Sequence, residues 1–240
     1  MIRLLGSVLA LVVVLVGAVA GYFYYYMANQ PDPTFWEGDI QRFEAANQDA
    51  GNPTGQVIFI GSSSIRFWAT LETDFAPLPV VNRGFGGSML PHVAHFAPRI
   101  VTPLAPAAVV IYAGDNDFGG LNPKSTEAVL EDFRAMLAYF DEALPTTPIY
   151  YLSIKPSLLR WESWPKIAAA NATFSEIADA HPRLTFVDVS TPMLGADGRP
   201  REDLFWYDGL HIDEDGYTLW TAILKPLLVS ALPSTQRSKE

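Results

Sequence analysis

Short apolar runs alternate along the chain with longer segments whose apolar residues recur at helical spacing. The runs are mostly continuous in character, as expected for strands that are covered on both faces. They fall at Val57–Ile60, Val80–Asn82, Ala107–Ala113, Ile149–Ile154 and Leu184–Val189. Strands separated by helices in this way predict a parallel α/β sheet with right-handed crossovers.

Four segments have a helical pattern. The first opens with Thr34 and Glu37, which are spaced as a capping box. The last contains Pro226, which we expect to kink or end the helix. The apolar positions of the four segments are Phe35, Trp36, Ile40 and Phe43; Val129, Phe133, Met136, Leu137, Phe140 and Leu144; Ile167, Ala170, Phe174 and Ile177; and Leu219, Trp220, Ile223 and Leu224.

The N-terminal segment differs from the rest of the chain. The 23 residues from Leu4 to Tyr26 carry no charge, and a helix of that length covers a hydrocarbon core of roughly 30 Å. Arg3 precedes the segment and acidic residues follow it, which predicts a cytoplasmic N-terminus and a body on the outer side. Ala18-Val19-Ala20 also resembles a signal-peptide cleavage site, so secretion after cleavage near Ala20 is the alternative.

These patterns divide the chain into four parts. Residues 1–27 are a membrane anchor or signal segment, 28–33 a linker with two prolines, 34–233 one folded domain and 234–240 a disordered tail. Either reading of the N-terminus exports the domain, so we expect it outside the cytoplasm, in a periplasmic or extracellular location. A single N-terminal transmembrane helix anchors it in the first reading.

Composition narrows the function classes. The chain has 240 residues, 16 Lys and Arg against 26 Asp and Glu, a net charge of −10 and no Cys. An acidic surface disfavours nonspecific binding to nucleic acids. The lack of Cys excludes thiolate nucleophiles, disulfides and Cys-ligated metal centres.

Polar residues follow the strands where a parallel sheet gathers its chemistry, at the carboxyl ends. The first strand breaks into Gly61-Ser62-Ser63-Ser64, the second into the glycine-rich run Asn82–Ser88, and the third into Gly114-Asp115-Asn116-Asp117. Far downstream lies Asp208-Gly209-Leu210-His211. Each segment alone could be a helix cap or a turn.

Together the four segments supply the components of acyl transfer. A serine hydroxyl needs a base, histidine is the base that works near neutrality, and a carboxylate must orient the imidazole. Negative charge on the carbonyl oxygen needs preorganised donors. No cofactor and no metal is needed for this chemistry.

From about Val57 to Tyr217 the arrangement resembles the SGNH (GDSL-type) esterase and lipase superfamily. The resemblance implies Ser63 as nucleophile, with Asp208 and His211 as orienting carboxylate and base. It implies an oxyanion hole formed by the Ser63 and Gly87 backbone N–H groups and the Asn116 side chain. It also implies a flavodoxin-like three-layer sandwich with a five-stranded parallel sheet of order 2-1-3-4-5.

The first block departs from the family pattern. Ser62 stands where the family usually has Asp, so three consecutive hydroxyls compete as nucleophile. The alignment of Gly61 and of Trp68, a frequent tail of this block, favours Ser63.

The expected activity is hydrolysis of acetyl or short acyl esters through an acyl-enzyme. The substrate would be a small-molecule, carbohydrate or lipid ester. Acyl transfer to another alcohol, lysophospholipase activity, and noncatalytic ligand binding by the same fold are the alternatives.

Two further groups of residues are candidates for binding. Lys155, Trp161 and Trp164 follow the fourth strand, at the edge expected to hold the site, where they could bind substrate or simply pack. His92 and His95 have metal-ligand spacing, but no carboxylate or third His lies at a diagnostic spacing, so a role in a loop or pocket wall is favoured.

Overall fold

The computed structural model describes residues 11–22, 25, 32–120 and 122–232. The chain divides into two compact units, Met1–Phe35 and Trp36–Glu240. In the first unit, residues 11–22 are helical with exposed side chains. Over the residues that the structure describes, none of the helices combines the length and the apolar character needed to cross a bilayer. The predicted anchor over Leu4–Tyr26 lies partly outside those residues, as does most of the linker and all of the 234–240 tail.

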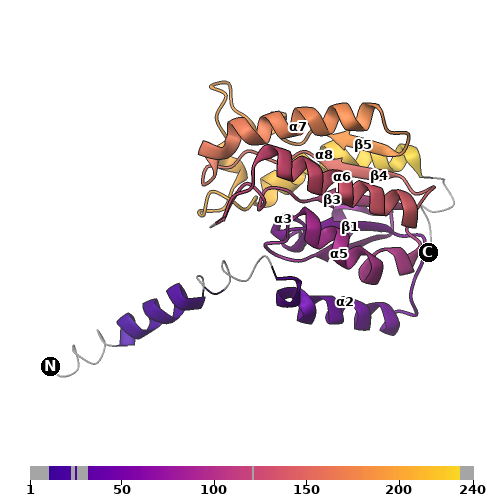
Figure 1. Ribbon diagram of the computed structural model, residues 1–240, viewed down its shortest axis with the longest axis horizontal. Helices are drawn as coiled ribbons and strands as arrows, with labels where there is room; N and C mark the ends of the chain where they lie inside the picture. The colour runs from indigo at the N-terminus through magenta and orange to yellow at the C-terminus, as the bar shows by residue number, and fades with distance from the viewer. Residues whose placement is uncertain (1–10, 23–24, 26–31, 121, 233–240) are drawn as a thin grey trace, which may run out of the picture. The chain divides into compact units, whose positions relative to one another are not determined.

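The second unit is built on one five-stranded sheet (Figure 1). The strands are β1 Val57–Gly61, β2 Val80–Gly84, β3 Ala108–Tyr112, β4 Ile149–Leu152 and β5 Leu184–Val187. All neighbouring pairs are parallel and the order is β2-β1-β3-β4-β5. The predicted strands and strand order are confirmed.

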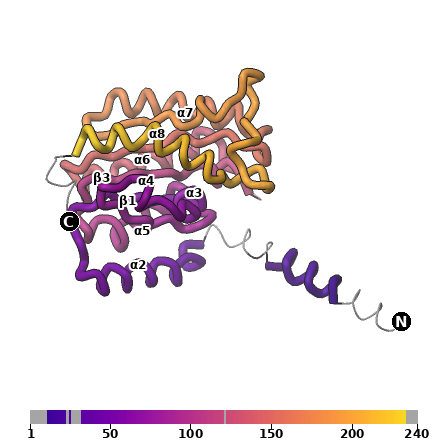
Figure 2. The backbone as a smooth tube through the Cα atoms, turned by 180° about the vertical axis from the view of Figure 1, so that it is seen from behind, coloured from indigo at the N-terminus to yellow at the C-terminus, as the bar shows by residue number. Residues whose placement is uncertain are grey.

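Helices cover both faces of the sheet. On one face lie α5 Leu90–Ile100, α6 Thr126–Ala143 and α7 Trp164–Asp179, with α2 Glu37–Asp49 against α5 (Figure 1). On the other lie α3 Ser63–Arg66, α4 Leu71–Phe75 and α8 Glu214–Ala231, seen from behind in Figure 2. Short 3-10 turns occupy Pro33–Trp36, Thr102–Leu104, Trp161–Ser163, Thr191–Met193 and Glu202–Leu204.

The two faces of the sheet have separate aromatic cores, because successive strand residues point to opposite sides. Phe59 packs with Trp68 and Phe75 on the α4 and α8 face, at ring-centroid distances of 5.8 and 4.9 Å. Tyr151 packs with Phe133 of α6 and Phe174 of α7 on the other face. Continuous apolar strands therefore serve both cores.

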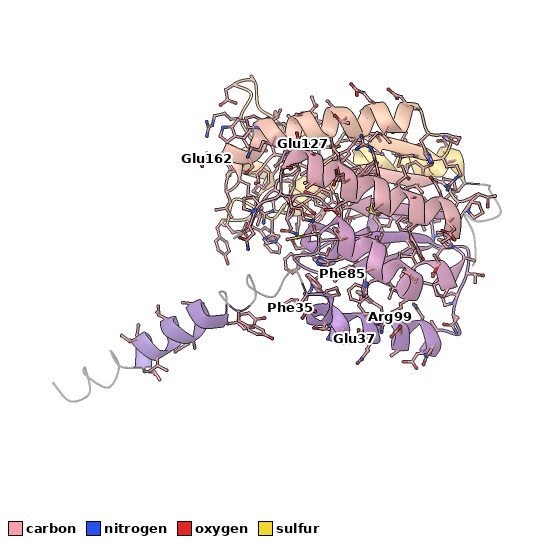
Figure 3. All side chains as sticks on the ribbon, in the orientation of Figure 1. Phe35, Glu37, Phe85, Arg99, Glu127 and Glu162 are labelled. Atoms are coloured by element: carbon pink, nitrogen blue, oxygen red, sulfur yellow. The ribbon has the colours of Figure 1, made fainter. Side chains whose placement is uncertain are left out.

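An ion-pair network joins α2 to α5. The Arg99 guanidinium of α5 donates to the carboxylates of Glu37 and Glu44 of α2, with nitrogen–oxygen distances of 2.7 Å in both pairs. Arg99 and Glu37 are labelled in Figure 3. A single arginine thus bridges the first residue of α2 and a residue about two turns further along the helix.

The helices differ from the sequence predictions at three places. The capping box at Thr34 is wrong: Thr34 donates to Asp32, and α2 begins at Glu37 without a side-chain cap. Pro226 does not end α8, which continues to Ala231. Helix α5, which contains Pro91 and Pro98, was not among the predicted helices. Pro91 lies in the first turn, where the missing N–H is not needed for helix bonding.

Candidate active site

The site begins with a turn that only glycine permits. Gly61, the last residue of β1, has φ of 145°, and a Cβ there would lie 1.9 Å from the carbonyl oxygen of Tyr112 on β3. The next residue, Ser62, donates its N–H to that same oxygen at 3.0 Å. The chain then enters α3 at Ser63. Because β1 is flanked by β2 and β3, this turn lies at the topological switch point of the sheet.

Ser63, His211 and Asp208 form a continuous hydrogen-bonded chain. The Ser63 Oγ lies 2.9 Å from His211 Nε2, and His211 Nδ1 lies 2.6 Å from Asp208 Oδ2. The other Asp208 oxygen, Oδ1, accepts the backbone N–H groups of Leu210 and His211, each at 2.9 Å. The loop from Trp206 to His211 is closed by a backbone bond, in which the Trp206 N–H donates to the His211 carbonyl at 2.8 Å. The structure therefore brings Ser63 to Asp208 and His211, although Ser63 and His211 are 148 positions apart in the sequence.

The Asp208 carboxylate is held in its charged form. Partial burial raises its pKa, but the bonds from the His211 ring and from the Leu210 and His211 N–H groups outweigh that effect and lower the pKa below its ordinary value. An ionised Asp208 favours the tautomer that carries a proton on His211 Nδ1. His211 Nε2 is then the acceptor that faces the Ser63 hydroxyl.

The three consecutive serines have different surroundings. Ser62 and Ser64 are buried, and the Ser62 hydroxyl has no partner within the described part of the chain. Ser63 is partly exposed and its hydroxyl contacts His211. Of the three, Ser63 thus has both access to solvent and a base.

Two candidate oxyanion donors come from the ends of β2 and β3. Gly87 has φ of 77°, a conformation that favours glycine. The Asn116 amide is held at both ends: Nδ2 donates to the Ser88 carbonyl and Oδ1 accepts from the Arg160 guanidinium, each at 3.0 Å. One Asn116 N–H is therefore used by Ser88, and the orientation of the other is fixed.

A buried charge cluster supports Asn116. The Asp115 carboxylate accepts from Arg160 at 2.5 Å and from Lys155 at 3.2 Å, and Arg160 also donates to the Asp115 carbonyl at 2.9 Å. Burial raises the Asp115 pKa, but the two cations outweigh it and hold the pKa well below its ordinary value. Arg160 therefore links a buried carboxylate to the Asn116 amide. The sequence placed Arg160 after the fourth strand without indicating this contact.

The candidate substrate-binding residues occupy two different settings. Lys155 is buried, and its ammonium is held by Asp115 instead of facing an open pocket. Trp161 and Trp164 are partly exposed and stack with ring centroids 6.0 Å apart, with the Arg199 guanidinium 5.3 Å above Trp161. Their role as substrate contacts stays a prediction.

The histidines considered as metal ligands have structural contacts. His92 Nδ1 accepts the Met89 N–H at 3.0 Å at the start of α5, and its ring lies 4.3 Å from that of Trp36. His95 packs edge-on against Phe96. In the ranges that the structure describes, no three His, Asp or Glu side chains are grouped to hold a metal ion.

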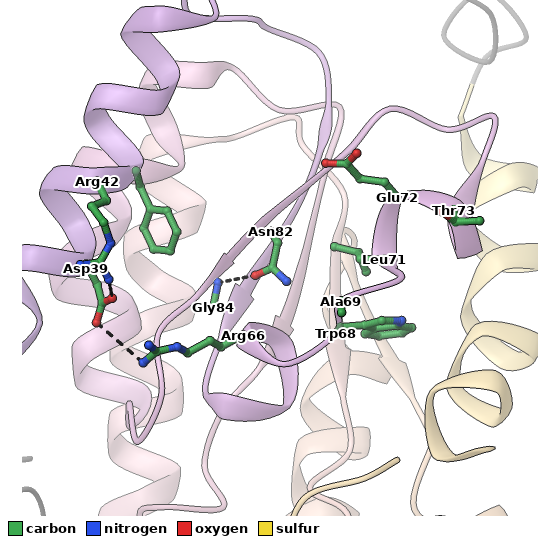
Figure 4. A pocket seen from close by; sticks show the side chains of 11 residues that line it. Asp39, Arg42, Arg66, Trp68, Ala69, Leu71, Glu72, Thr73, Asn82 and Gly84 are labelled. Atoms are coloured by element: carbon green, nitrogen blue, oxygen red, sulfur yellow. Dashed lines mark hydrogen bonds and ion pairs between the residues drawn. The ribbon is translucent and has the colours of Figure 1, made fainter. Parts of the chain in front are cut away.

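A separate cavity of about 520 Å³ lies between α2, α3, α4 and β2 (Figure 4). Its walls carry charges of both signs, from Asp39, Arg42, Arg66 and Glu72. Neither Ser63 nor His211 lines it, so it is not the site described above.

The fold and the site define the class of protein as an ester hydrolase with a parallel α/β sheet. The chain belongs to the GDSL-like lipase/acylhydrolase family, whose sequence model matches residues 60–219, and thus to the SGNH hydrolases. A comparison with curated proteins gives no match.

Solved structures share the fold. A Streptococcus pneumonia protein provisionally described as a platelet activating factor has a TM-score of 0.74 and 21% identity, covering 88% of this chain and 99% of its own. A GDSL-like lipase from Bacteroides thetaiotaomicron has a TM-score of 0.71 and 23% identity, covering 80% and 98%. A carbohydrate esterase family 3 protein from Talaromyces cellulolyticus has a TM-score of 0.59 and 18% identity, covering 74% and 97%.

Proposed function

We propose that the protein is a serine esterase that acts through Ser63, His211 and Asp208. His211 Nε2 takes the proton of the Ser63 hydroxyl while Oγ attacks the ester carbonyl. The protonated His211 then gives that proton to the departing alcohol, which leaves an acyl-enzyme. Water, deprotonated by His211, attacks the acyl carbon and releases the acid, and the proton returns to Ser63.

In this mechanism the negative charge of each tetrahedral intermediate lies on the former carbonyl oxygen. We assign its stabilisation to the backbone N–H groups of Ser63 and Gly87 and to the free N–H of Asn116. Two observations support the assignment. Ser63 is the first residue of α3, so its N–H has no acceptor within the helix, and the Asn116 amide is clamped by Ser88 and Arg160.

The observation that carries the proposal is the 2.9 Å contact between Ser63 Oγ and a histidine whose other nitrogen lies 2.6 Å from a carboxylate. It is tested by hydrolysis of p-nitrophenyl acetate. We expect Ser63→Ala to lower kcat by about 10³-fold or more, because no other group replaces the nucleophile. Ser62→Ala is the matched control and keeps most of the activity. Undiminished activity of Ser63→Ala would overturn the proposal.

For the substrate we propose acetyl or other short acyl esters. The fold shared with a carbohydrate esterase makes acetylated carbohydrate the first class to assay. A series of acyl lengths on one alcohol tests this, with the highest kcat/KM expected for the shortest chains. Rising kcat/KM toward long chains would instead indicate a lipid ester.

For the location we propose a domain held outside the cytoplasm by the uncharged segment Leu4–Tyr26. The charge of Arg3 before it and of Asp32, Glu37 and Asp39 after it supports this orientation. Membrane fractionation of the full chain, with protease added to intact spheroplasts, tests it. We expect a membrane-bound and protease-accessible domain. A mature N-terminus just after Ala20 would show secretion instead, and an inaccessible full-length chain would contradict both.

A further inference from the structure

Exposed apolar side chains gather at one place on the second unit. Among its described residues, the large apolar side chains that are exposed are Phe67, Leu159, Trp206, Tyr207 and Leu227. Leu227 is on α8, and the other four lie on the loops around His211. We call Phe67, Leu159, Trp206 and Tyr207 the apolar rim.

The rim is attached directly to the candidate base. The Phe67 ring lies 5.0 Å from the His211 ring, edge to face, and the Trp206 ring lies 5.9 Å from it. Phe67 and Trp206 are 5.5 Å apart and form one surface. The Leu159 N–H donates to the Gly209 carbonyl at 3.0 Å, which ties the loop after β4 to the loop that carries Tyr207 and His211.

The rim side chains are not buried in the core, so packing of the fold does not explain why apolar residues occupy these positions. Tyr207 is fully exposed and Trp206 and Phe67 are 41% and 37% exposed, so much of their apolar surface stays in water. A cluster of exposed apolar side chains beside a reacting group is typical of a binding surface.

The chemistry at His211 indicates which part of an ester meets the rim. The base delivers its proton to the oxygen of the departing alcohol, so that oxygen must come within hydrogen-bonding distance of His211 Nε2. The carbonyl oxygen faces the proposed oxyanion donors, which are the N–H groups of Ser63, Gly87 and Asn116. In the bound ester, the carbon skeleton of the alcohol therefore lies next to the rings that pack on His211.

We infer that the apolar rim is the subsite for the alcohol part of the ester, and that it takes an alcohol with a flat apolar face. This inference rests on the proposed esterase function. The rings of Phe67 and Trp206 contact the alcohol, and Tyr207 and Leu159 extend the surface outward. The acyl group lies elsewhere and does not contact the rim.

The test compares three acetate esters, 1-naphthyl, phenyl and methyl acetate, at concentrations where each is dissolved as a monomer. The variants are Trp206→Ala and Tyr207→Ala, and the control is Leu227→Ala, which removes an apolar side chain with the same 37% exposure as Phe67. Dividing each variant's kcat/KM by the wild-type value for the same ester cancels the intrinsic reactivity of the leaving group. The value of kcat/KM reports the steps from free enzyme and ester up to release of the alcohol, so it is sensitive to contacts between the enzyme and the alcohol.

We expect Trp206→Ala to lower kcat/KM for 1-naphthyl acetate about 10-fold more than for methyl acetate, with phenyl acetate between them. The Tyr207 side chain is fully exposed, so Tyr207→Ala should not disturb folding. We expect this variant to lower kcat/KM for 1-naphthyl acetate about 3-fold more than for methyl acetate. Leu227→Ala leaves the ratio of kcat/KM for 1-naphthyl acetate to kcat/KM for methyl acetate at its wild-type value. A second series, naphthyl esters of rising acyl length, shows the same Trp206→Ala effect at every length.

Equal losses for all three alcohols would overturn the inference, and so would a loss that changes with acyl length, which would place the acyl group on the rim. Both outcomes leave the proposed esterase function intact. A wild-type protein that hydrolyses none of these esters would contradict the proposed function itself.

Discussion

Arg160 should control catalysis through the Asn116 amide. Its guanidinium donates to Asn116 Oδ1 at 3.0 Å, and the Ser88 carbonyl accepts from Asn116 Nδ2 at 3.0 Å. A flip of the amide would bring Oδ1 against the Ser88 oxygen and the NH₂ group against the Arg160 cation. Both contacts are repulsive, so the pair fixes the direction of the remaining N–H. Arg160→Met removes half of this clamp.

The size of the effect follows from the contacts. Loss of a whole oxyanion donor lowers kcat by about 10²–10³-fold, which we expect for Asn116→Ala. A hydrogen bond to a charged group contributes about 1.5–3 kcal/mol. Because the Ser88 contact remains, we expect about half of this energy, about 0.75–1.5 kcal/mol, to be lost from the transition state. This loss lowers kcat of Arg160→Met about 3- to 13-fold with little change in KM.

The assay is a double-mutant cycle on p-nitrophenyl acetate. If Arg160 acts through Asn116, Arg160→Met has no further effect in the Asn116→Ala background. Arg160→Lys should be intermediate, because one ammonium cannot bond Asp115 and Asn116 in the same forked geometry. Urea unfolding of each variant separates this effect from loss of structure, since the change also leaves Asp115 with Lys155 as its remaining cation. Additive losses in kcat, or an unchanged kcat in a folded Arg160→Met, would refute the reasoning.

Two predictions concern stability. The pKa of Asp115 is held low by its cations, so its contribution to stability is present above about pH 4 and is lost as the pH falls further, when the unfolded chain takes up the proton first. The free energy of unfolding should therefore fall less steeply between about pH 5 and 3 in Asp115→Asn than in wild type or in the exposed control Glu131→Gln; parallel slopes would contradict this. Gly84→Ala should destabilise by about 2 kcal/mol or more, because a Cβ there lies 2.2 Å from the Arg66 backbone nitrogen. Gly38→Ala in α2, where a Cβ meets nothing within 4 Å, should stabilise by about 0.5–1 kcal/mol; urea unfolding of the pair checks both, and equal effects would contradict the steric argument.

The sheet could be predicted because its strands are buried on both faces and so read as continuous apolar runs. The helices were harder. Helix α5 was missed, and neither Pro91 nor Pro98 prevents it from forming. The short helices α3 and α4 have too few residues to show a period. At the N-terminus of α2, a local bond from Thr34 to Asp32 replaced the predicted capping box.

Much of the site could be predicted for a topological reason. Ser63 and Asn116 follow neighbouring parallel strands, so their sequence positions already bring them to one edge. The Arg160 contact could not be predicted, because it depends on a long side chain passing Gly119, where a Cβ would lie 2.6 Å from the guanidinium carbon. Trp206 and Tyr207 directly precede Asp208, and that adjacency was a signal for the apolar rim.

The central claim is that Ser63 is the nucleophile, and covalent labelling tests it most directly. The full chain is treated with a fluorophosphonate, digested, and mapped by mass spectrometry to find the modified residue. The account predicts one adduct on Ser63, absent in Ser63→Ala and retained in Ser62→Ala and Ser64→Ala. An adduct on Ser62 or Ser64 in the wild-type protein, or no adduct on any serine, would contradict it.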